Sequence, residues 1–181
     1  MSKNSFNNRI IRAAKLDPNL YEEVEADKSA LGQAMAIVVL SSIAAGIGLY
    51  KTGGFSGIIT GTMASLVSWY VWAYLTYFIG TKFLPEPQTK SDLGELLRTI
   101  GFSSSPGLLR VFYFVPGIGI MLYLISSFWM LVAMIIAVRQ ALDYNSTLRA
   151  VGVCVIGYII QIFVLVIILS IFGGVLPETT P

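Results

Sequence analysis

"LRTIGFSSSPGLLRVFYFVPGIG", Leu97–Gly119, is the stretch that decides the fold of this chain. It lies within a very apolar sequence, yet it contains three consecutive serines, two arginines and two prolines. It can therefore be a loop, a soluble element or an irregular membrane span. Which of these it is fixes how often the chain crosses the bilayer and on which side each loop lies.

Apolar residues dominate the whole chain. Of its 181 residues, 55% are hydrophobic and only 12% are charged, and the mean hydropathy is +0.75. Soluble globular domains carry about 25% charged residues. Several runs of about 20 apolar residues are long enough to cross a hydrocarbon core of roughly 30 Å. The composition predicts a polytopic membrane protein, and a net charge of +2 is too small to indicate binding of nucleic acid.

The chain contains no histidine and a single cysteine, Cys154, which lies in an apolar run. This excludes an intramolecular disulfide, a zinc cluster and every mechanism that needs a histidine base. A serine nucleophile would then need a lysine in the membrane core, but Lys51, Lys82 and Lys90 all lie at span ends. We therefore expect no enzymatic activity, no metal site and no cofactor.

Residues 1–30 are polar and are expected to form a cytoplasmic, amphipathic N-terminal segment. Within residues 2–16, apolar side chains recur at helical spacing with basic residues between them, which predicts a basic amphipathic helix. Such a helix can lie on an anionic membrane surface or dock on the cytoplasmic face of the protein itself. A second helix is expected to begin near Pro18, with Asp17 as its N-cap.

Four apolar runs predict regular membrane spans at about residues 31–50, 55–80, 118–138 and 148–172. Around the start of the second span, Gly53, Gly57 and Gly61 recur at intervals of four residues, and we call them the glycine stripe. Small residues at this spacing allow helices to approach closely in lipid. We expect the glycine stripe to make a contact within the chain rather than between two copies.

The distribution of Lys and Arg decides whether residues 96–115 form a fifth span, because basic residues near span ends stay in the cytoplasm. With five spans and a cytoplasmic N-terminus, ten of the 12 Lys and Arg residues face the cytoplasm. With four spans only eight do, because Arg139 and Arg149 move outside. We therefore predict an all-α, five-span bundle over residues 31–174 of the cell membrane, followed by an extracytoplasmic tail at residues 175–181.

The predicted third span is expected to be tilted or broken. Pro106 removes a backbone donor, and the serines at 103–105 can satisfy groups that it frees. Pro116 opens a tight turn before the next run. Arg110 would cost about 2.5–3.5 kcal/mol at the centre of a lipid-facing helix. It can instead snorkel to the near surface or line a polar crevice inside the bundle, and both alternatives stay open.

The polar connector between the last two runs, "RQALDYNSTL", contains Arg139 and Asp143. They lie four residues apart and can meet if the helix continues through them. The alternatives for this element are a structural clasp that closes the helix and a docking surface for a partner.

The stretches at residues 96–119 and 126–151 together resemble the Yip1-domain family, and residues 6–27 resemble the N-terminal segment of its short, prokaryotic-type members. The resemblance implies five transmembrane helices and a cytoplasmic N-terminus. The family's Gly-Tyr…Pro motif corresponds to Gly101, Phe102 and Pro106, with Phe in place of Tyr. Eukaryotic members are implicated in vesicle traffic and bind Rab-type GTPases. Their long N-terminal region carries an Asp-Leu-Tyr-Gly-Pro motif, of which "DPNLYEEV" keeps only part.

Small-residue helix faces, few charges within the spans and short loops favour a non-enzymatic membrane scaffold or adaptor in membrane organisation or trafficking. The alternative is a small channel or transporter that uses the broken third span around Ser103–Arg110. The residues expected to carry function are Gly101, Phe102, Ser103, Pro106, Arg110, Pro116, Arg139 and Asp143. Besides the lipid bilayer, the expected partners are anionic lipid at the N-terminal helix, an unidentified membrane protein and a second copy of the chain.

Overall fold

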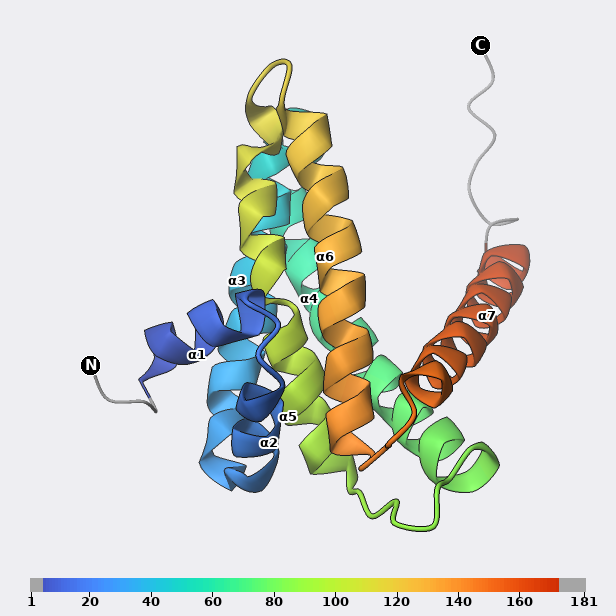
Figure 1. Ribbon diagram of the computed structural model, residues 1–181. Helices are drawn as coiled ribbons and strands as arrows, with labels where there is room; N and C mark the ends of the chain where they lie inside the picture. The colour runs from blue at the N-terminus through green and yellow to red at the C-terminus, as the bar shows by residue number, and fades with distance from the viewer. Residues whose placement is uncertain (1–4, 173–181) are drawn as a thin grey trace.

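The computed structural model describes residues 5–172, apart from the side chains of residues 52 and 165–172, and this part of the chain is helical without strands (Figure 1). The tail predicted at residues 175–181 lies outside the described residues. The elements in chain order are α1 (Phe6–Ala14), α2 (Pro18–Ala26), η1 (Lys28–Ala30), α3 (Leu31–Gly48), α4 (Tyr50–Phe78), η2 (Ile79–Phe83), α5 (Leu93–Ser103), η3 (Ser105–Phe114), α6 (Gly119–Ala141) and α7 (Thr147–Phe172).

Four helical segments of the described chain are long and apolar enough to cross a membrane. They are Lys28–Gly48, Gly53–Phe83, Gly119–Ala141 and Thr147–Val164. They coincide with the four regular apolar runs of the sequence, so the chain is a multi-pass membrane protein.

The serine- and proline-rich stretch forms a broken helix. An Asp92–Glu95 capping box starts α5, which ends at Ser103, and a ten-residue 3₁₀ helix, η3, continues from there. Pro106 cannot donate to the carbonyl of Phe102, and the Ser105 hydroxyl donates to that carbonyl instead at 2.7 Å. The predicted break at Pro106 is therefore confirmed. Because a 3₁₀ helix rises about 2 Å per residue, α5 and η3 together extend roughly 36 Å.

The broken helix runs parallel to α3 in close contact. A Cβ atom on Gly101 would lie 2.7 Å from the Cβ of Ala34, and one on Gly107 would collide with the Ser41 hydroxyl. Farther along, the last residue of α3 lies against η3. Helix α6 returns along the other side of the broken helix, after a turn in which Gly117 has a φ of +85°.

Helices α1 and α2 pack on the protein rather than standing free. Asp17 accepts a hydrogen bond from the backbone N–H of Asn19, and α2 begins at Pro18 as predicted. Leu20, Tyr21 and Phe102 have no exposed surface and share one apolar cluster, which also contains Ala13 of α1. In the structure, α1 is therefore docked on the rest of the protein.

The connections on either side of the α5–η3–α6 unit meet at one end of the bundle. The Gln88 side chain donates to the carbonyl of Asp143 at 2.9 Å, and Glu86 accepts from the N–H of Asn145 at 3.0 Å. Gln140 reaches α2 at this end, where it donates to Glu22 at 2.6 Å. We call this end, with α2 and the connections at residues 84–92 and 142–146, the loop end.

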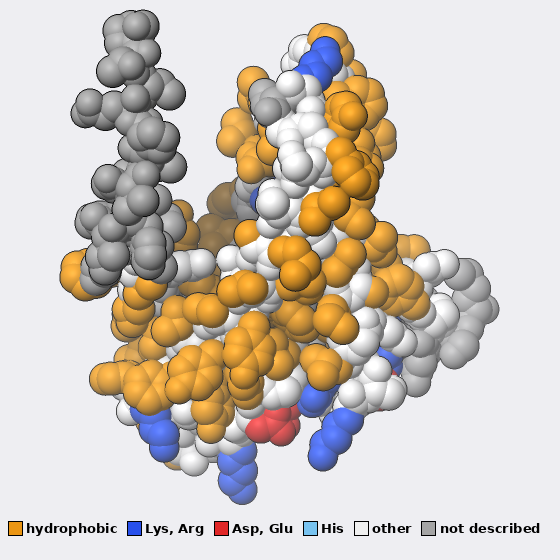
Figure 2. Space-filling model, turned by 180° about the vertical axis from the view of Figure 1, so that it is seen from behind, with side chains coloured by type: hydrophobic (Ala, Val, Ile, Leu, Met, Phe, Trp, Pro, Cys, Tyr) orange, Lys and Arg blue, Asp and Glu red, His pale blue; other side chains and the backbone are white. Residues whose placement is uncertain are grey.

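Helix α7 leans away from the other helices beyond its first turns (Figure 1). Ala150, Val153 and Cys154 are buried against α4 and the end of α6, whereas Tyr158 and Phe163 are more than half exposed. Hydrophobic side chains cover most of the back of the molecule. Lys and Arg gather there at the loop end, with a basic side chain at the opposite end (Figure 2).

Candidate functional site

A crevice of about 620 Å³ lies between α3, α4, α5, η3, α6 and α7, within the apolar part of the bundle. Its lining includes the glycine stripe, serines from four segments of the chain and two tryptophans. Arg110 is the only charged residue among those that line it. The crevice therefore places a single charged side chain and several hydroxyl groups between apolar helices.

Arg110 enters the crevice from η3. Its Nη2 donates to the hydroxyl of Ser127 at 3.0 Å, and its guanidinium carbon lies 5.0 Å from the centre of the Tyr123 ring. The Nε atom is buried and has no hydrogen-bond partner. No carboxylate within the described residues forms an ion pair with Arg110. Its charge is held by one hydroxyl and one aromatic face, which leaves most of its N–H groups available.

The glycine stripe lines this crevice and does not pack against another helix. A Cβ atom added at Gly53, Gly57 or Gly61 would meet no atom within 4 Å. The prediction of a helix contact within the chain was therefore wrong, because the surface that the glycines leave smooth faces the open crevice. The same face of α4 continues with Ser65 and Ser68.

Four predicted site residues belong to the packed interior of the broken helix. Gly101, Phe102, Ser103 and Pro106 are all buried, and the Ser103 hydroxyl donates to the carbonyl of Ile100 at 2.7 Å. Of these four, only Ser103 lines the crevice. Pro116 lies far from them, exposed in the turn between η3 and α6.

Arg139 and Asp143 do not meet as the sequence spacing suggested. Helix α6 ends at Ala141, and Asp143 has a φ of +54°, which takes it off the helical path. Arg139 instead donates to the carbonyls of Tyr144 and Asn145, each at 3.2 Å. Its contacts are those of a clasp that closes the helix.

The sequence profile of the Yip1 domain matches residues 17–171, which is most of the chain. The chain belongs to the Yip1-domain family. No curated protein and no solved structure matches this Yip1-domain chain.

A second polar feature of this Yip1-domain protein lies at the loop end, where four carboxylates gather that the sequence does not bring together. Glu22 and Glu25 come from α2, Glu95 from α5 and Asp143 from the α6–α7 connection, and we call them the acidic face. None of the four forms an ion pair with another described residue. Glu22 and Asp143 line a polar hollow of about 520 Å³, whose lining also includes Arg139.

Glu25 is the most perturbed carboxylate of the acidic face. Burial, together with the nearby charges of Glu22, Glu95 and Asp143, raises the pKa of Glu25 to about 8. Its Oε2 atom is buried without a hydrogen-bond partner. Near neutral pH the Glu25 carboxyl is mainly protonated, so the acidic face gains a negative charge as the pH rises through about 8.

Buried arginines fix the acidic face to the spans. Arg9 of α1 is only 1% exposed and donates to Glu23 at 2.9 Å, to Asp27 at 2.7 Å and to Gln33 at 3.0 Å. Although burial alone would raise it, the pKa of Glu23 is held below its usual value by hydrogen bonds from Arg12 and Arg9. Sequence patterns alone do not reveal this network, because its acceptors come from α2, α3 and the connection between them.

Arg98 ties α5 to the C-terminal end of α2. It is buried, and it donates to the backbone carbonyls of Val24 and Glu25. The last carbonyls of a helix have no partner within that helix, and a cation there is favoured by the helix dipole. Arg98 thus fixes Glu25 relative to the membrane-spanning part of the chain.

Proposed function

We propose that this Yip1-domain protein is a non-enzymatic adaptor of the cell membrane that crosses the bilayer five times. In this proposal its loop end lies in the cytoplasm, and the acidic face there binds a basic segment of a partner protein. The observation that carries the proposal is the acidic face itself: four carboxylates without ion-pair partners among the described residues, held on a frame of buried arginines.

Five crossings are supported by the contacts at the loop end. The connection before α5 touches the connection after α6, so the chain must leave this end through α5 and η3 and return through α6. Helix α6 is long and apolar enough to cross a membrane, and the broken helix covers a similar length beside it.

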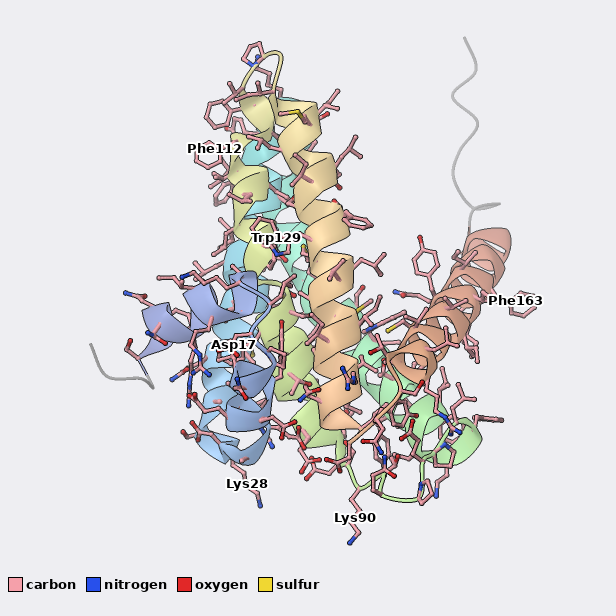
Figure 3. All side chains as sticks on the ribbon, in the orientation of Figure 1. Asp17, Lys28, Lys90, Phe112, Trp129 and Phe163 are labelled. Atoms are coloured by element: carbon pink, nitrogen blue, oxygen red, sulfur yellow. The ribbon has the colours of Figure 1, made fainter. Side chains whose placement is uncertain are left out.

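A cytoplasmic loop end is supported by the distribution of basic residues. Lys28 and Lys90 project from the loop end, whereas Phe112 lies in the opposite half of the bundle (Figure 3). Basic residues near span ends remain in the cytoplasm.

We predict a specific labelling pattern for single cysteines introduced into a Cys154→Ala background. With five crossings, a cysteine at Pro116 should react with a membrane-impermeant maleimide on intact cells. Cysteines at Lys90 and Asn145 should react only after permeabilisation, because both lie at the loop end. With four crossings, a cysteine at Asn145 would react on intact cells and a cysteine at Pro116 only after permeabilisation. This outcome would refute the topology with five crossings.

The adaptor proposal predicts binding of a lysine-rich peptide to the full-length protein in phosphatidylcholine nanodiscs, measured by fluorescence anisotropy. At a pH of about 9, where Glu25 is ionised, the E22Q/E25Q variant should bind roughly fivefold more weakly, because two charge pairs at the surface contribute about 0.5 kcal/mol each. The matched E22D/E25D variant, which keeps both charges, should bind nearly as well as the wild type.

The raised pKa of Glu25 adds a pH signature to this experiment. Peptide affinity should rise as the pH passes through about 8, where Glu25 ionises, and the E25Q variant should lose this rise. Equal binding of the lysine-rich peptide by wild type and E22Q/E25Q would contradict the proposed role of the acidic face.

A further inference from the structure

We propose that the crevice binds one acidic phospholipid from the leaflet farther from the loop end, with its phosphate on Arg110 and an acyl chain along the glycine stripe. This site is separate from the acidic face, and the inference does not depend on the adaptor role.

The charge of Arg110 points to an anion. It is the only charged side chain among the lining residues, and its Nε is buried and unpartnered. An arginine at membrane depth without a counter-charge is costly, whereas hydrogen bonds from a guanidinium to a phosphate are strong and can be bidentate. A phosphate would meet the N–H groups that Ser127 does not occupy.

The depth of Arg110 fits a lipid headgroup of one leaflet. Its partner Ser127 lies eight residues after Gly119, the first residue of α6, which is about 12 Å along the helix from the end opposite the loop end. Arg110 is therefore nearer to that end than to the loop end. A phosphate reaches it by entering the crevice to a similar depth, about 12 Å from this end.

The glycine stripe provides a path for an acyl chain. Beyond the kink at Gly54, the lining face of α4 extends about 16 Å from Gly57 to Ser68, close to the roughly 15 Å thickness of one hydrocarbon leaflet. Because a Cβ atom at any of the three glycines would meet nothing within 4 Å, the space over the stripe is free. A slender, flexible hydrocarbon chain fits such a path.

The lining changes character along its length in the order that a lipid requires. Arg110 and Ser127 lie toward the far end, whereas Trp69 and Trp72 line the crevice beside α5. Trp72 is only 8% exposed. The one charged side chain thus lies toward the far end, and the deeper part is lined by two tryptophans and several serines, which leaves the charged headgroup position at Arg110.

Two other occupants fit these observations less well. An apolar helix of a second copy could cover the glycine stripe but would bring no charge to Arg110. Free inorganic phosphate could bind Arg110 but would leave the stripe empty. One acidic phospholipid can place its phosphate on Arg110 and an acyl chain along the stripe, so it fills both parts of the crevice.

The experiment uses full-length protein in phosphatidylcholine nanodiscs that contain a minor fraction of phosphatidylglycerol with a photoreactive acyl chain. After illumination, labelled peptides are mapped by mass spectrometry. We expect labelling of α4 at the glycine stripe and of the opposing η3 and α6 surfaces. Photoreactive phosphatidylcholine should label these sites about tenfold less, because it lacks the net negative charge that pairs with Arg110.

Three variants separate the parts of the site. R110Q keeps a donor for Ser127 but removes the charge, and should abolish the preference for phosphatidylglycerol. G57L has room for its side chain and should block labelling of the stripe while the protein remains folded. K51Q removes an exposed charge outside the crevice and should label like the wild type.

Equal labelling by the two lipids, or an unchanged preference in R110Q, would overturn the proposal. Loss of the preference on addition of millimolar inorganic phosphate would assign Arg110 to a free anion and would also overturn it. Crosslinks between two copies through the stripe, in place of lipid adducts, would do the same.

Discussion

Replacement of Arg9 by methionine should lower the free energy of unfolding by about 3–5 kcal/mol, the usual cost of removing one partner from a buried ion pair. Arg9 has almost no exposed surface, and it satisfies Glu23, Asp27 and Gln33 at once. Methionine can fill part of the same volume but offers no donor. The variant therefore leaves two carboxylates and an amide without their main partner.

The measurement is equilibrium unfolding in detergent by a denaturant, with R12M as the matched control. The Arg12 side chain is 21% exposed, so loss of its ion pairs should cost only about 1 kcal/mol. Combining R9M with E23Q and D27N should recover much of the loss, because uncharged replacements no longer leave buried charges unpaired. Equal losses in R9M and R12M would show that the burial of Arg9 has no energetic consequence.

The sequence was sufficient to predict the break in the third helix. Proline lacks a backbone donor wherever it occurs, and a neighbouring serine hydroxyl is an available substitute. Both facts are local, and the Ser105–Phe102 hydrogen bond is their result. The start of α2 at Pro18 was predictable for the same reason, because Asp17 caps the helix through its immediate neighbours.

Features that depend on distant partners could not be predicted. The pattern of α1 marked it as basic and amphipathic, but the acceptors for Arg9 come from residues 14 to 24 positions away. The acidic face combines α2, α5 and the α6–α7 connection. The residue pattern of one segment cannot indicate that its carboxylates lie close to carboxylates from other segments.

The contact between Arg139 and Asp143, expected only if the helix continued through them, does not form. A spacing of four residues brings side chains together only while the helix continues. The chain leaves the helix at Ala141, and Asp143 has a positive φ. The clasp interpretation of Arg139 agrees with its contacts to the carbonyls of Tyr144 and Asn145.

Two glycines in this chain should respond to the same substitution with opposite signs. Gly101→Ala should lower the free energy of unfolding by about 1–3 kcal/mol, because the added methyl group overpacks the seam between α5 and α3. The new Cβ would lie 2.7 Å from the Cβ of Ala34 and 3.1 Å from its backbone oxygen, and a backbone cannot turn aside as a side chain can. Gly57→Ala should instead raise the free energy by about 0.5–1 kcal/mol, since alanine loses less conformational entropy in a helix.

The same unfolding measurement on both variants tests the contrast directly. A stabilised Gly57→Ala together with a destabilised Gly101→Ala is the expected pair of results. Destabilisation by both substitutions would mean that the stripe is packed against a helix, as its four-residue spacing first suggested. The spacing of glycines shows only that close approach is allowed. Whether a helix or a lipid occupies the space depends on what lies opposite, and at Gly57 no protein atom lies within 4 Å of the added methyl group.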